Sequence, residues 1–187
     1  MPWSLSDVAR TLHLLHRWER LLHHRINHRR LVSTVIAGIS TVIAGIDPDT
    51  KQIVVSLPGG EFLVAATKER IAEHRFKPLM LQFRVLVLQL HTDWIYIERP
   101  PMGVNPRSTI DQAMVVGGIA SILIERGLNF SLVDPGTWKK GLLGNGRADK
   151  PLIRDWAIAN LGLPSDLKQD QYDAACIRRW GELSSGR

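Results

Sequence analysis

Four acidic residues stand at positions from which their carboxylates can meet at one point. Asp47 directly follows an apolar, β-branched segment, and Glu98 ends the segment WIYIE. Asp170 and Asp173 lie three residues apart in a segment with helical periodicity, so both side chains project from one face of that helix. Carboxylates are poor strand residues and are costly to bury unpaired. Two such acids after apolar strands therefore indicate that a cation is bound between them.

Divalent metal ions are the cations that such a group would bind. Mg²⁺, with Mn²⁺ as an alternative, takes oxygen ligands from a few carboxylates and from phosphates. Two ions about 3.5–4 Å apart can activate a water and stabilise the leaving oxygen of an in-line phosphodiester displacement. We therefore predict a two-ion site whose catalytic residues and metal ligands are Asp47, Glu98, Asp170 and Asp173. Each acid alone has an ordinary alternative, because strand-end Asp residues often form turns and an Asp-x-x-Asp pair is often a solvated helix face.

A segment rich in glycine and basic residues follows the last predicted strand. Residues 133–153 read VDPGTWKKGLLGNGRADKPLI. Its glycines let the backbone approach a phosphate closely, and its Lys and Arg side chains supply positive charge, so the segment can position a nucleic acid without reading its bases. The residues predicted to contact DNA here are Lys139, Lys140, Gly144, Gly146, Arg147 and Lys150. The alternative is a solvated basic surface turn.

The elements that position these residues alternate as in an α/β protein. The predicted strands are a first one ending at Asp47, then Gln52–Leu57, Glu61–Thr67, Trp94–Glu98 and Asn129–Val133. The predicted helices are Arg75–Leu90, Ser108–Arg126, Lys150–Leu161 and Asp166–Glu182. A Pro-Gly-Gly turn joins the second and third strands as a hairpin. This order is that of an RNase H-like fold, a mixed central β-sheet flanked by helices, here with an N-terminal helical extension.

The first strand is preceded by a duplication. Ser33–Ile39 reads STVIAGI, and Ser40–Ile46 reads STVIAGI again. Both copies are apolar and β-branched, so either can fill a buried strand. Only the second copy is followed by a carboxylate, that of Asp47, and we assign it as the strand of the site. The first copy extends that strand or links it to the preceding helix.

The N-terminal region is predicted to be one basic, amphipathic helix over residues 5–30. His24 and His28 have a spacing that can hold a metal, but a solvated basic face is the stronger interpretation, because no Cys or acidic ligand accompanies them. The helix is a candidate DNA-binding arm, a partner helix or an upstream extension that barely folds. The expected division is thus residues 1–32 as extension, 33–40 as the duplicated strand or linker, and 41–187 as nuclease domain.

Composition narrows the class of protein. The 187 residues are 44% hydrophobic and 22% charged, as in soluble globular proteins, and the net charge of +6 with a pI near 9.9 favours a polyanionic partner. The longest apolar run, Ala113–Ile124, is too short to cross a membrane, so no membrane partner is expected. A single cysteine, Cys176, excludes an internal disulfide and is typical of a cytoplasmic protein.

Together these motifs resemble the RuvC family of Holliday-junction resolvases over residues 41–182. The family's opening Gly-Ile-Asp-Pro is matched by Gly45–Pro48, its strand-terminal Glu by Glu98, its Lys and Gly-x-Gly-x-Ala-x-Lys signature by Trp138–Lys150, and its C-terminal acidic pair by DQYDAA. The resemblance implies a Mg²⁺-dependent crossover junction endodeoxyribonuclease of DNA recombination and repair. It also implies a homodimer whose two sites cut opposed strands of a four-way DNA junction, with the helix Ser108–Arg126 as a candidate interface.

Two departures from the family pattern indicate a divergent, phage-type member. Asp49 stands where the family has Gly, and no aromatic residue follows Glu98, so Met102 or Arg107 is the candidate to contact the junction in its place. Other functions stay open: an RNase H-like nuclease acting on other branched DNA or on RNA–DNA hybrids, and a non-catalytic junction-binding protein. A sugar-kinase or actin-like ATPase would need a duplicated domain for which about 140 core residues leave no room.

Overall fold

The computed structural model describes residues 41–100 and 105–185, which belong to one compact unit, Thr41–Arg187. The expected N-terminal helix, the first STVIAGI copy and Met102 lie outside the described residues, and the division into extension, linker and nuclease domain stays a prediction.

A five-stranded mixed sheet forms the centre of this unit, in the order β3-β2-β1-β4-β5. The strands are β1 (Ile43–Pro48), β2 (Gln52–Ser56), β3 (Phe62–Ala66), β4 (Trp94–Glu98) and β5 (Phe130–Val133). The pairs β1–β2 and β2–β3 are antiparallel, whereas β1–β4 and β4–β5 are parallel. The second STVIAGI copy supplies β1, as predicted, and Pro58–Gly60 forms the turn of the predicted hairpin.

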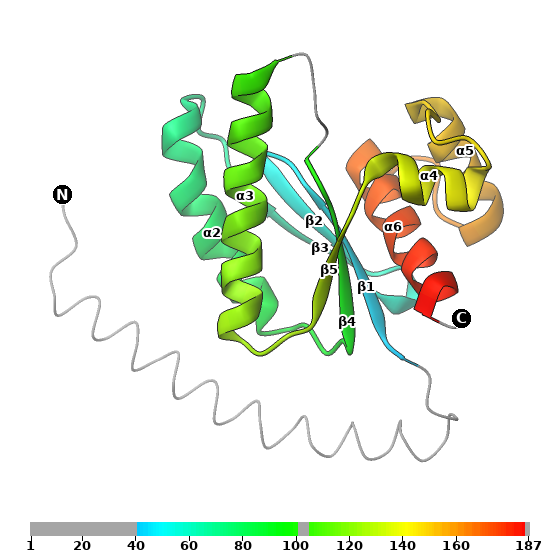
Figure 1. Cartoon of the computed structure of the whole chain (residues 1–187), viewed down its shortest axis with the longest axis horizontal. Coiled ribbons are helices and arrows are strands. Elements are labelled where there is room, and N and C mark those ends of the chain that lie inside the picture. Colours follow the sequence, from blue (N-terminus) through cyan, green and yellow to red (C-terminus); the bar gives the residue numbers. More distant parts are fainter. Residues whose placement is uncertain (1–40, 101–104, 186–187) are drawn as a thin grey trace, which may run out of the picture. The chain divides into compact units, whose positions relative to one another are not determined.

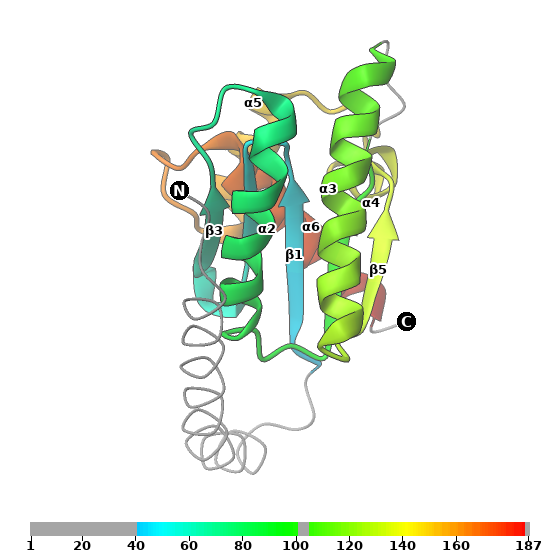
Figure 2. The same ribbon diagram turned by 90° about the vertical axis from the view of Figure 1, so that its left-hand side faces the viewer.

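Helices cover both faces of the sheet (Figure 1). One face carries α2 (Ala72–Val87) and α3 (Pro106–Glu125), which lie in front of the strands in Figure 2. The other face carries α4 (Pro135–Leu143), α5 (Lys150–Leu161) and α6 (Gln169–Ser185). The mixed sheet between two helical layers is the RNase H-like architecture that the sequence predicted.

The first part of the expected basic loop is a helix, α4, so the loop prediction was wrong there. Lys139 and Lys140 belong to a nine-residue helix that begins after Asp134, with Pro135 in its first turn, and ends at Gly144 with a left-handed φ of 73°. Proline just inside a helix and glycine just past its end are the usual signals of its limits. The remaining residues of the predicted loop, 144–149, connect α4 to α5.

Strand alternation decides which side chains face which helices. Ala44 and Ile46 of β1 and Ile95 and Ile97 of β4 belong to the core shared with α2 and α3. Since successive side chains on a strand point to opposite faces, the residues between and after them face α4, α5 and α6. Glu98 and Asp47 are therefore on the face that carries α6.

Gly45 lets α6 approach β1 at backbone distance. A Cβ at Gly45 would lie 2.3 Å from the carbonyl oxygen of Ala174 and 2.4 Å from the backbone nitrogen of Arg178, both on α6. No side chain fits in that space, because real Cβ contacts do not occur below 3.0 Å. This contact brings the acidic residues of α6 up to the end of β1.

Helix α3 extends beyond the apolar run Ala113–Ile124, because it already begins at Pro106. Among the described residues it is the one helix long and apolar enough, by length and composition only, to cross a membrane. Its residues Val115, Ile119 and Leu123 are buried in the core with α2 and the sheet. The apolar character of α3 is thus partly that of a core helix in a globular domain.

Candidate active site

Three carboxylates meet where β1 ends against α6. Oxygen atoms of Asp47, Asp170 and Asp173 all lie within 4.8 Å of one another. Asp47 comes from the strand, and the other two come from the first turns of α6, where their spacing of three residues puts both side chains on the face toward the sheet. The structure therefore brings together three of the four predicted acids in one small group.

Glu98 joins this group from the neighbouring strand. The parallel register pairs Ile46 with Ile97, so the next residue of each strand, Asp47 and Glu98, follows at the same edge of the sheet. The Glu98 carboxylate lies beside the cluster, near enough for its charge to raise the pKa of Asp47. Its Oε2 atom accepts a hydrogen bond of 2.6 Å from Nε1 of Trp138.

Burial and mutual repulsion make these carboxylates hard to ionise together. Burial is the largest cause that raises the pKa of Asp47 well above its usual value, and the charges of Glu98, Asp173 and Asp170 add to it. Burial raises the pKa of Glu98 to about 7, although the Trp138 hydrogen bond opposes the rise, and it raises the pKa of Asp173 to about 6. A bound cation would remove this repulsion.

Neutral donors, and no cationic partner, contact three of the acids. Nε2 of Gln169 donates to Asp173 at 3.0 Å, Nε2 of Gln52 donates to Asp170, and Trp138 donates to Glu98. Within residues 41–100 and 105–185, none of the four acids has an ion pair, and Asp47 has no side-chain hydrogen bond. Among the described residues, the positive charges that act on Asp173 and Glu98 are those of Lys139 and Lys150, without an ion pair.

The donor set fits a hard divalent cation. Carboxylate oxygens, several of them converging, are the ligands that Mg²⁺ and Mn²⁺ prefer, and such ions keep further positions for water and phosphate. Four other acids act on Asp47 with their charges, three of them members of the predicted set, and no donor among the described residues bonds to its side chain, so Asp47 is placed to be the central ligand. His and Cys ligands, which would favour zinc, are lacking among the described residues of the cluster.

Two of the predicted DNA-contacting lysines reach the site. The positive charges of Lys139 and Lys150 both oppose the rise in the pKa of Asp173, and Lys139 also opposes that of Glu98. Lys139 follows Trp138 on α4, and Lys150 begins α5. These two helices thus bring cationic side chains to the rim of the acidic cluster.

The other predicted contacts are distributed more widely. Lys140 and Arg147 are exposed, and Gly144 ends α4. Gly146 faces Gly136 so closely that a Cβ would lie 3.0 Å from the Gly136 carbonyl oxygen. Arg107, at the start of α3, lies 3.8 Å from Glu73 of α2. The structure therefore places Arg107 in the other helical layer, away from α4 and α5.

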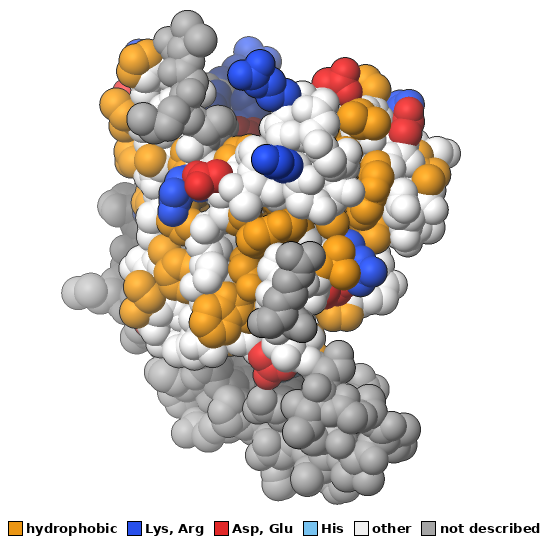
Figure 3. All heavy atoms as spheres, turned by 45° about the vertical axis from the view of Figure 1, so that its right-hand side comes forward, with side chains coloured by type: hydrophobic (Ala, Val, Ile, Leu, Met, Phe, Trp, Pro, Cys, Tyr) orange, Lys and Arg blue, Asp and Glu red, His pale blue; other side chains and the backbone are white. Residues whose placement is uncertain are grey.

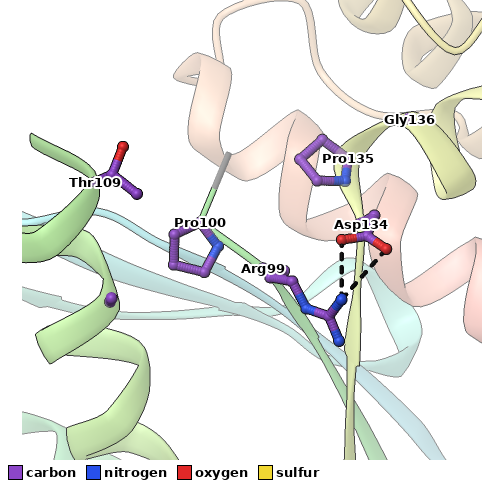
Figure 4. A pocket seen from close by; sticks show the side chains of 7 residues that line it. Arg99, Pro100, Thr109, Asp134, Pro135 and Gly136 are labelled. Atoms are coloured by element: carbon purple, nitrogen blue, oxygen red, sulfur yellow. Dashed lines mark hydrogen bonds and ion pairs between the residues drawn. The ribbon is translucent and has the colours of Figure 1, made fainter. Parts of the chain in front are cut away.

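A pocket of about 570 Å³ opens at the carboxyl ends of β4 and β5 (Figure 4). Pro100 and Pro135 line it, and Arg99 and Asp134 form an ion pair of 3.2 Å at its side. Thr109 of α3 lies across from them. The pocket is mainly apolar, and none of the four acids lines it.

Residues that sequence analysis missed are the neutral donors. Trp138 is part of the predicted DNA-contacting motif, but the motif gave it no role. Gln169 directly precedes Asp170, and this position in the sequence could have indicated that Gln169 lies near the site. Gln52 follows Asp47 in the next strand, and nothing in its position indicated that it would meet α6.

The fold, with acids at the ends of two adjacent parallel strands and on the last helix, is that of the RNase H-like nucleases. The model of the family described as crossover junction endodeoxyribonuclease RuvC matches residues 43–178. The chain therefore belongs to the RuvC family, as its motifs predicted.

Individual relatives support this membership. The chain is 30% identical over 145 residues to a crossover junction endodeoxyribonuclease RuvC of Wolinella succinogenes, covering 72% of this chain and 90% of that protein. It is 29% identical over 146 residues to the one of Helicobacter hepaticus, covering 72% and 79%. The structure of T. thermophilus RuvC in complex with Holliday junction substrate matches with a TM-score of 0.65 and 17% identity, covering 78% of this chain and 94% of that one. That structural likeness concerns the fold.

Proposed function

We propose that this protein is a crossover junction endodeoxyribonuclease that cuts four-way DNA junctions in recombination and repair. The observation that carries the proposal is the group of Asp47, Asp170 and Asp173, with carboxylate oxygens within 4.8 Å and Glu98 beside them. Family membership supplies the reaction class. The free, buried Cys176 agrees with a cytoplasmic setting.

In this proposal the four acids hold two Mg²⁺ ions, with Mn²⁺ as a substitute. Bound there, the ions supply Lewis-acid chemistry, activating water and stabilising the leaving oxygen of the phosphodiester. The chain's own part is to place the ligands. Asp47 occupies the centre, Asp170 and Asp173 approach from α6, and Glu98 approaches from β4.

Basic residues of α4, α5 and their connection hold the DNA backbone in this proposal. The charges of Lys139 and Lys150 act on Asp173, so in this proposal these lysines attract the phosphates that approach the site. Figure 3 shows Lys and Arg side chains as separate groups on one face of the molecule, several of them beside Asp or Glu side chains. Such a surface can contact individual phosphates at chosen positions, and Lys140, Arg147 and the backbone at Gly144 and Gly146 would supply further contacts.

A homodimer is the second part of the proposal. Ile110, Met114 and Ile124 of α3 are 60%, 53% and 68% exposed, and their spacing of four and ten residues puts them along one side of the helix. In this proposal, these side chains form the apolar part of the interface between two copies of the chain. A two-fold dimer through α3 would present two acidic sites to a junction of matching symmetry.

The test is cleavage of labelled substrates in Mg²⁺: a four-way junction, a plain duplex, a flap and an RNA–DNA hybrid. Asp47→Asn should abolish cleavage, since it removes the central ligand. The matched control is Asp49→Asn, which removes a neighbouring acid outside the cluster and should leave cleavage within a few-fold of the unaltered protein.

Each result has one meaning. Paired symmetric nicks in the junction, lost in Asp47→Asn and kept in Asp49→Asn, support the proposal. Cleavage of the flap or the hybrid in preference to the junction would keep the acidic site and replace the substrate. Tight junction binding without cleavage of any substrate would make the protein a junction-binding protein.

A further inference from the structure

Trp138 lies at the centre of the site's supporting layer. Its side chain has an exposed fraction of 0%, and it belongs to the core formed by β5, α4, α5 and α6. It stands in the first turns of α4, next to Lys139. A large planar ring packed in this way has one orientation, so the direction of its N–H group is fixed by the core.

The edge of this indole contacts a predicted metal ligand. Nε1 donates to Oε2 of Glu98 at 2.6 Å, across 40 residues of sequence. An indole N–H is a neutral donor that accepts nothing and carries no charge. It can therefore fix one oxygen of the Glu98 carboxylate without neutralising it, while the second oxygen stays free for a cation.

The face of the same ring contacts the neighbouring cation. Nζ of Lys139 lies 5.3 Å from the centroid of the Trp138 ring, a cation–π distance. Lys139 in turn acts electrostatically on Glu98 and Asp173. One buried side chain thus contacts an acidic ligand with its edge and a basic residue of the site with its face.

We propose that Trp138 is a positioning residue that sets the orientation of the Glu98 carboxylate toward the bound metal ions. The proposal rests on the proposed function of the acidic cluster and assigns to Trp138 a role in it. Gln52 and Gln169 make single contacts of the same neutral kind with Asp170 and Asp173, but Trp138 is the donor that the core holds rigidly.

The first experiment is Mn²⁺ binding to the full chain without DNA, followed by the electron paramagnetic resonance signal of the free ion. Trp138→Phe keeps an aromatic ring and removes the N–H group, and it should weaken Mn²⁺ binding about 10- to 100-fold, the usual effect of losing a partner of a metal ligand. The matched control is Trp94→Phe, which removes a 3.1 Å indole bond to Ser131 at the opposite end of β4 and should change binding less than two-fold.

A double-mutant comparison separates orientation from general packing. The double variant Glu98→Gln, Trp138→Phe should bind Mn²⁺ less than two-fold more weakly than Glu98→Gln alone, because the carboxylate that Trp138 orients is already gone. An equal loss in both backgrounds, or Mn²⁺ binding of Trp138→Phe within two-fold of the unaltered protein, would overturn the proposal. Absence of Mn²⁺ binding in the unaltered protein would instead overturn the proposed function itself.

A second measurement needs no change at Trp138 and so does not depend on the folding of that variant. In a ¹H–¹⁵N spectrum, the Trp138 indole resonance should move on Glu98→Gln and again on addition of Mg²⁺ to the unaltered protein, whereas the Trp94 resonance should stay in place. A Trp138 resonance that is insensitive to both changes would refute the contact that the proposal requires.

Discussion

Replacing Glu98 with Gln should stabilise the metal-free protein at high pH. Burial raises the pKa of Glu98 from 4.5 to about 7, so the folded protein holds a proton in this interval that the unfolded chain has released. The contribution of Glu98 to the free energy of unfolding therefore falls as pH rises from about 4.5 to about 7 and stays low above it. Glutamine has no proton to lose, and it can still accept the Trp138 hydrogen bond.

The magnitude follows from that pKa. Each pH unit by which a pKa is raised corresponds to about 1.4 kcal/mol of stability, so a rise from 4.5 to about 7 corresponds to about 3 kcal/mol above pH 7. We expect the Glu98→Gln and unaltered proteins to differ little at pH 4. At pH 8 the variant should be more stable by a few kcal/mol, because the buried charge and its repulsion with Asp47 and Asp173 are gone.

The assay is urea unfolding in EDTA at pH 4, 5.5, 7 and 8. The control is Glu125→Gln on the surface, where hydrogen bonding to Arg84 lowers the pKa, so the charge of Glu125 favours folding above its usual pKa and the variant should gain no stability at pH 8. Addition of Mg²⁺ at pH 8 should then stabilise the unaltered protein more than Glu98→Gln. A Glu98→Gln protein whose stability relative to the unaltered protein is the same at pH 4 and pH 8 would refute the reasoning.

Three further predictions concern the packing of α6, the cap of α5 and the proposed dimer interface. Gly45→Ala should destabilise the fold by about 3 kcal/mol or more in urea unfolding, because its Cβ would meet backbone atoms of α6, whereas Gly136→Ala, with 3.7 Å to its nearest neighbour, should cost little. Asp149→Ala should cost about 1 kcal/mol, since the Asp149 side chain accepts from Leu152 N at 3.1 Å as the cap of α5; an equal loss in Asp149→Asn would contradict the capping role. Met114→Asp should convert the proposed dimer to a monomer in analytical ultracentrifugation, and an unchanged mass would place the interface elsewhere.

Much of the fold could be predicted because it is encoded in local patterns. The β-branched run before Asp47, the WIYIE segment and the Pro-Gly-Gly turn each determine an element within a few residues. Helix α4 was missed because it is short and contains Gly136 and Gly141, which weaken a helix. It is held in place by the burial of Trp138, a tertiary contact that helix propensity does not include.

Local sequence determined that Asp47 and Glu98 end strands, because β-branched and apolar residues precede each of them, and helical periodicity determined that Asp170 and Asp173 share a helix face. The distances among these acids depended on the approach of α6 to Gly45, which no local pattern measures. The donors Trp138 and Gln52 reach their carboxylates from 40 and 118 residues away. Tertiary structure also decided the raised pKa values, since desolvation and repulsion arise only when separate segments bury the same charges together.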